Sequence, residues 1–180
     1  KRKAPHGAAE AEIYFLDLGD EGGEPLQVTN DSVEQDHVFI QGGRIVWSDY
    51  SSDPDGVYMD VNDPNENNAD IMGYDIDLAI HFTVTDHPSK QLRPAIEGDT
   101  VVWLDWRGIQ PEPKYSEFGL YTTILNTDVG EQKIAVSSWN APELWVRPLI
   151  HDGVVAWIAE DYGIEGTTRL FLSVLGEEPT

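Results

Sequence analysis

The chain has 180 residues, 40% of them hydrophobic and 10% aromatic, which is too apolar for a disordered segment and long enough for one domain with a core. No apolar run approaches the roughly 20 residues that span a bilayer. Because cysteine is absent, disulfides, thiolate metal sites and a cysteine nucleophile are excluded. The formal net charge of −22 repels nucleic acids and anionic membranes, so we expect neither a nucleic-acid partner nor membrane insertion.

The elements predicted after an N-terminal tail (residues 1–10) are all short β-strands. Each is rich in aromatic and β-branched residues and is bounded by Gly, Asp or Asn. Two strands are followed by a hairpin with a Gly- or Asp-containing turn, and this order occurs three times before one last strand. In chain order these are strands 12–18 and 24–30 with hairpin 37–50, strands 70–76 and 80–86 with hairpin 93–108, strands 119–125 and 132–138 with hairpin 147–163, and strand 169–175.

The three hairpins repeat one pattern at an almost constant step. An Ile precedes each turn and a Trp follows it, and the repeat tryptophans Trp47, Trp103 and Trp157 are 56 and 54 positions apart. No stretch has helical periodicity. Four antiparallel strands in about 55 residues are typical of a β-propeller blade. The Trp is then predicted to pack between neighbouring blades.

The middle unit resembles the repeat of TolB-like β-propellers. The resemblance covers about residues 11 to 175, and the first and third units keep it only in part, with Trp47 and Asp49 in the first, and Pro148 and Trp157 but Ala159 in the third. In the middle unit it is carried by Asp70, Ile71, Tyr74, Asp75, Pro94, Ile96, Gly98, Val101, Val102, Trp103, Asp105 and Arg107. The Asp105 and Arg107 pair is expected to form an ion pair or to cap a hairpin.

The resemblance implies an all-β, partial propeller of four-stranded blades in a periplasmic, secreted or cell-surface protein. The expected blades are residues 11–50, 70–117 and 118–161, with an acidic insertion at 51–69 and the start of a fourth blade at 162–180. Such rings usually close with about six blades, within the four to eight of propellers in general. Three blades imply a segment of a longer protein, a ring completed by another copy or another chain, or an arc whose ends a partner covers.

The acidic insertion offers oxygen ligands densely, as calcium requires. We expect calcium, if any cofactor, to be held by Asp60, Asn62, Asp63 and Asp70. The spacing departs from that of an EF-hand, because no Gly stands at its sixth position and no Glu at its twelfth. A solvated surface loop is the alternative, since Asp, Asn and Pro are also its usual residues.

A second candidate stretch, residues 137–148, carries two tryptophans outside the repeat, Trp139 and Trp145. Aromatic side chains on a loop can anchor a partner or a sugar ring. They can equally cover the open end of a core.

No Gly-x-Ser-x-Gly, His-Glu-x-x-His, phosphate-loop or dinucleotide motif occurs. We therefore expect a non-catalytic interaction or scaffold module of a larger extracytoplasmic assembly, which recognises its partner through the loops between strands. The alternative is an enzyme or enzyme subunit with a propeller fold, carbohydrate-active or hydrolase-associated. A calcium-stabilised adhesion module is a third option.

Overall fold

The computed structural model describes residues 11–31, 33–52, 68–107, 116–139, 147–160 and 168–176, without the side chains of 116–118, 136–139, 159–160 and 168. All regular secondary structure in these ranges is β-structure, which confirms the all-β prediction. Accordingly, the described ranges contain no helix that is long and apolar enough to cross a membrane.

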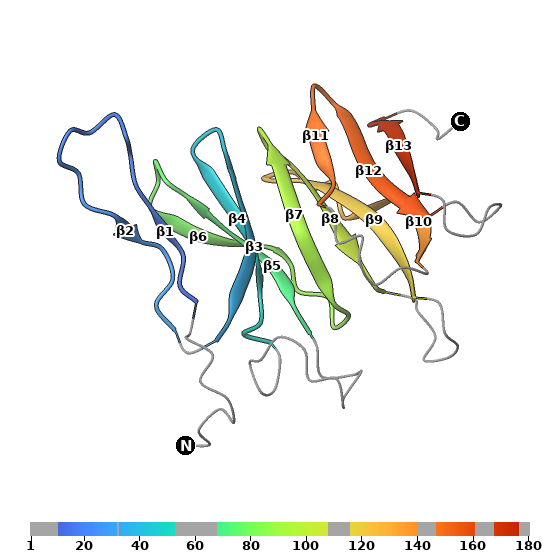
Figure 1. Ribbon diagram of the computed structural model, residues 1–180, viewed down its shortest axis with the longest axis horizontal. Helices are drawn as coiled ribbons and strands as arrows, with labels where there is room; N and C mark the ends of the chain where they lie inside the picture. Colours follow the sequence, from blue (N-terminus) through green and yellow to red (C-terminus); the bar gives the residue numbers. More distant parts are fainter. Residues whose placement is uncertain are drawn as a thin grey trace, which may run out of the picture.

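The strands form four antiparallel sheets that follow one another in chain order across Figure 1. Within each sheet the strands are neighbours in sequence, and none of the described sheets closes on itself. We call the sheets the N-terminal pair and the first, second and third sheets. The N-terminal pair is β1 (Tyr14–Phe15) and β2 (Leu26–Gln27); the first sheet is β3 (Gln35–Gln41), β4 (Arg44–Asp49), β5 (Asp70–Asp75) and β6 (Ile80–Thr85); the second is β7 (Gln91–Glu97), β8 (Thr100–Asp105), β9 (Ser116–Ile124) and β10 (Gln132–Trp139); the third is β11 (Leu149–His151), β12 (Val154–Glu160) and β13 (Thr168–Val174).

Hydrogen bonding groups the strands differently from the units expected at 11–50, 70–117 and 118–161. The hairpin with the repeat Trp begins the first, second and third sheets, whereas the sequence suggested that it ends each unit. The cause lies in the pairing of β4 with β5, in which Trp47 lies opposite Met72 across the 51–69 insertion. Only the first and second sheets have four strands in the described residues; the third has three and the N-terminal pair two.

The hairpin turns have the backbone conformation that their glycines predict. Gly42 and Gly43 have φ of 57° and 79°, and Asp152 and Gly153 have φ of 52° and 74°. Positive φ at both central residues is the type I′ pattern, whose twist matches that of paired strands. In the turn of the second sheet, Gly98 has a positive φ of 57° and Asp99 does not. The turns therefore fix the register that places Ile before the turn and Trp after it on one face of each sheet.

The sheets stack face to face, and each interface is built in the same way. We call the side of a sheet that carries the repeat Trp its tryptophan face and the other side its rear face. Val46 and Ile71 on the rear face of the first sheet pack with Val101, Trp103 and Tyr121 on the tryptophan face of the second. The same arrangement joins the second sheet to the third and the N-terminal pair to the first. The core therefore consists of three successive apolar layers between sheets.

Arg44 ties the turn of the first sheet to that of the second. Its Nε donates to Asp75 Oδ2 at 3.2 Å, and its Nη1 donates to the Gly98 carbonyl at 2.8 Å and to Asp99 Oδ1. The hydrogen bond with Asp99 is the main reason that the pKa of Arg44 is raised. Polar contacts at the turns thus supplement the apolar layers in fixing adjacent sheets.

Candidate functional site

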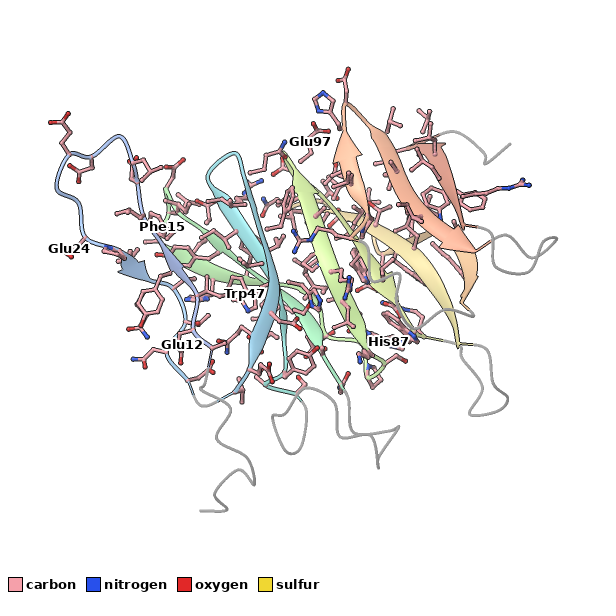
Figure 2. All side chains as sticks on the ribbon, viewed as in Figure 1. Glu12, Phe15, Glu24, Trp47, His87 and Glu97 are labelled. Atoms are coloured by element: carbon pink, nitrogen blue, oxygen red, sulfur yellow. The ribbon has the colours of Figure 1, made fainter. Side chains whose placement is uncertain are left out.

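The sheets have a turn end, where the hairpins reverse, and an opposite end, where the longer connections run. Figure 2 shows Glu97 at the turn end and His87 at the opposite end. The Asp residues that follow the repeat tryptophans lie at the opposite end of β4 and β8. Of the candidate residues within the described ranges, Asp70, Asp105 and Trp139 fall at this end.

The Trp-x-Asp pattern forms the same hydrogen-bonded unit in the first and second sheets. Residues two apart on a strand share a face, so the Asp carboxylate lies beside the indole. Trp47 Nε1 donates to Asp49 Oδ2 at 2.9 Å, and Trp103 Nε1 donates to Asp105 Oδ2 at 3.1 Å. The second oxygen of each Asp accepts the backbone N–H two residues later, from Ser51 at 3.0 Å and from Arg107 at 2.7 Å.

Arg107 extends this unit in the second sheet. Its Nε and Nη2 donate to Asp105 Oδ2 at 2.9 and 2.6 Å. Its Nη1 forms an ion pair with Glu131, and its guanidinium lies 4.4 Å from the centroid of the Tyr121 ring. Burial opposes the charge, but the hydrogen bonds with Asp105 and Glu131 raise the pKa of Arg107. Asp105 is fully buried. Its oxygens are thus occupied by contacts within the second sheet.

The third sheet has Ala159 where the carboxylate stands in the others. Trp157 stacks on Phe171 of the neighbouring strand, with ring centroids 5.7 Å apart and planes at 18°, much as Trp103 stacks on Tyr121 at 6.2 Å and 29°. The two residues are direct cross-strand partners. The repeat Trp therefore has a ring partner within its own sheet in all three sheets, and in the first and second sheets it has a carboxylate partner as well.

Asp70 is the one predicted calcium ligand within the described residues. It begins β5 opposite Asp49, and its side chain is buried, with 4% exposed. Its Oδ2 accepts a hydrogen bond from Ser52 Oγ, whereas Oδ1 is buried with no hydrogen-bond partner. Burial raises the pKa of Asp70, the Ser52 hydrogen bond lowers it, and the nearby charges of Asp86 and Asp49 raise it further.

The other three predicted ligands, Asp60, Asn62 and Asp63, lie outside the described residues. Within the described ranges, no group of three or more His, Cys, Asp or Glu side chains could hold a metal ion. One buried carboxylate at the edge of the acidic insertion is therefore what the structure contributes to the calcium hypothesis.

The predicted recognition tryptophans are reached only in part. Trp139 is the last residue of β10, at the opposite end of the second sheet, and its side chain is outside the description. Trp145 lies outside the described residues. A recognition role for either remains a prediction.

Sequence reasoning missed a set of three basic residues, one on or just before the first strand of each of the first, second and third sheets. His37, Arg93 and Arg147 each stand three positions before the Ile of a hairpin, a spacing that the sequence displays. His37 and Arg93 have positive φ (53° and 62°) at bulges in β3 and β7. Arg147 donates to the Val38 carbonyl at 3.0 Å, and burial lowers its pKa. In this strongly acidic chain, Arg93 lies on the first strand of the second sheet and Arg147 lies two residues before the first strand of the third.

The chain was compared with known protein families and with curated proteins, and it matches none of them.

Proposed function

We propose that the chain is a partial β-propeller of the TolB-like type that serves as a non-catalytic interaction or scaffold module in a larger extracytoplasmic assembly. The observation that carries the proposal is an apolar surface on the third sheet. Seven apolar side chains share its rear face. Val154, Ala156 and Ile158 are partly buried, and Leu149, Leu170, Leu172 and Val174 are exposed. Contiguous exposed apolar surface of this kind marks interaction sites.

The stacked sheets support the propeller part of the proposal. Two four-stranded antiparallel sheets and a third with three described strands, each packed by its tryptophan face on the rear face of the sheet before it, fit the blades of a propeller. In such a module the blades supply rigidity and the surfaces and loops supply recognition.

Site-specific photocrosslinking tests the interaction role. A photocrosslinking amino acid at Leu172 should give covalent adducts in envelope and secreted fractions of the source organism, whereas the same amino acid at Leu78 should give none. Leu78 is the matched control because it is also 66% exposed but lies at the turn between β5 and β6. Adducts from neither position, or equally from both, contradict the proposal.

An enzyme or enzyme subunit is the second candidate, and Asp70 favours it. A buried carboxyl with a raised pKa can serve as the general acid of a glycoside hydrolase, and Asp49 on the paired strand is a second carboxylate. Turnover of aryl glycosides that Asp70→Asn abolishes without unfolding the chain would establish this function. A panel of such substrates that the folded protein leaves intact removes it.

A calcium-stabilised adhesion module is the third candidate. The buried Asp70 Oδ1, which no donor satisfies, is the observation that supports it. A rise in melting temperature in millimolar calcium that chelator reverses is the result that this candidate requires.

A further inference from the structure

The chain repeats one interface three times, and its two ends expose the two halves of that interface. We propose that a second copy of the chain docks head to tail, with the C-terminal surface of one copy on the N-terminal surface of the other. The C-terminal surface is the rear face of the third sheet; the N-terminal surface is Tyr14, Leu16 and Leu18, alternate residues in and after β1. The inference rests on the proposed function, because it names the partner of the interaction module.

The C-terminal surface is defined by comparing residues at one position of the repeat. Ile71 precedes the residue opposite Trp47, Leu120 precedes the residue opposite Trp103, and Leu170 precedes the residue opposite Trp157. Ile71 and Leu120 are 0% and 1% exposed because the next sheet covers them, whereas Leu170 is 66% exposed. The same apolar position is thus covered twice and open once.

The N-terminal surface shows the complementary difference. In the repeat, Tyr14, Leu16 and Leu18 correspond to Met72, Tyr74 and Ile76 of the first sheet. Those three residues pack against Ile13 and Val28 of the N-terminal pair. Tyr14, Leu16 and Leu18 are all exposed. They therefore offer the side of the interface that the rear face of the third sheet lacks.

Ile40, on the first strand of the first sheet, gives an independent sign that the exposure of an apolar residue depends on whether a complete sheet stands beside it. Ile96 and Ile150, the residues before the turns of the second and third sheets, are buried on tryptophan faces that a preceding sheet covers. Their equivalent, Ile40, is exposed, and the N-terminal pair before it has two strands only. Burial of the repeat's apolar positions therefore follows the presence of a complete sheet beside them.

Charge explains the conditions under which the copies should meet. Each carries −22, so they repel at low ionic strength, and molar salt shortens the screening length to about 3 Å. The docking surfaces themselves are apolar. Head-to-tail contacts are heterologous and close into a ring when the rotation allows. If the two-stranded N-terminal pair is counted as part of a blade, each copy has four sheets, and a closed dimer has eight, the upper end of the four to eight blades of propellers.

The experiment is light scattering of the purified chain at micromolar concentration, in low and in molar salt. We expect twice the chain mass in molar salt. The C-end variant, Leu170→Glu with Leu172→Glu, and the N-end variant, Tyr14→Glu with Leu16→Glu, should each weaken association at least tenfold. A control variant, Leu78→Glu with Ile80→Glu, adds the same charge at exposed leucine and isoleucine positions away from both surfaces and should still dimerise.

Mixing the two end variants is the decisive step. The intact N-terminal surface of one can still meet the intact C-terminal surface of the other, so the mixture should regain a dimer that neither forms alone. A wild-type chain that stays monomeric in all salts, or a dimer that persists in the N-end variant, overturns head-to-tail docking. A folded monomer that still crosslinks to another protein through Leu172 would refute head-to-tail docking and leave the proposed function standing. Absence of any adduct at Leu172 would refute the proposed function.

Discussion

Replacement of Asp105 by alanine should be among the most damaging changes of a polar residue in the described part of the chain. The carboxylate is fully buried and accepts from Trp103 Nε1 and from the backbone and side chain of Arg107. Its removal leaves the buried Trp103 N–H unpaired, which costs about 1–3 kcal/mol. Loss of the ion pair adds to this, although Arg107 keeps Glu131.

The expected loss is about 3 kcal/mol, the lower end of the about 3–5 kcal/mol for removing one partner of a buried pair. For a chain of this size, the loss corresponds to a fall in melting temperature of about 6–12 °C. Asp49→Ala is the matched control, because Asp49 makes the same bonds to Trp47 and to a backbone N–H without an arginine. Asp49→Ala should cost about 1–3 kcal/mol.

Urea unfolding of both variants, with Arg107→Ala added to each, separates the arginine contribution in a double-mutant cycle. A coupling of about 1.5–3 kcal/mol is expected between Asp105 and Arg107, as for hydrogen bonds to charged groups, and none between Asp49 and Arg107. Equal losses for Asp105→Ala and Asp49→Ala, with no coupling, would refute the reasoning.

Three further predictions concern packing, pH and calcium. Gly73→Ala should destabilise the fold by about 1–3 kcal/mol, since its methyl group would enter the ring of Phe82; Gly130→Ala, which has open space around it, should be nearly neutral by the same urea titration. Because burial raises the pKa of Asp70, its protonated form favours the fold, and that contribution is lost as pH rises through the folded-state pKa. Asp70→Asn should therefore melt above wild type at pH 7 in chelator, the gap closing below about pH 4, near the ordinary pKa of Asp; a constant gap contradicts the assignment. If Asp70 holds calcium, millimolar calcium should raise the melting temperature of wild type but not of Asp70→Asn.

The local structure was predictable because it depends on neighbours in sequence. Glycines at 42 and 43 permit the positive φ of a tight hairpin, and alternation along β8 places Asp105 on the face of Trp103. The grouping of strands into sheets was not predictable in the same way. A four-strand period looks the same from any starting strand, and only hydrogen bonding across the 51–69 insertion shows where each sheet begins.

The candidate sites were less predictable because they depend on what lies around a residue. Asp70 is one of many acidic residues in its stretch, and nothing in the sequence distinguishes the carboxylate that becomes buried. The three basic residues His37, Arg93 and Arg147 do have a sequence signal, because each stands three positions before the Ile of a hairpin. The bulges that take His37 and Arg93 out of regular strand pairing are visible only in the structure.

Leu120 and Leu170 show why the end surfaces could not be derived from the sequence alone. Both are leucines at one position of the repeat, both follow a strand with a repeat Trp, and either would be assigned to a core by its hydrophobicity. One is 1% exposed and the other 66%. Because the two leucines are chemically identical, the difference comes entirely from whether a sheet stands beside them. A surface that the chain covers wherever it can is a surface that its partner is expected to cover, and in head-to-tail docking the covering surface is that of Tyr14, Leu16 and Leu18 of a second copy.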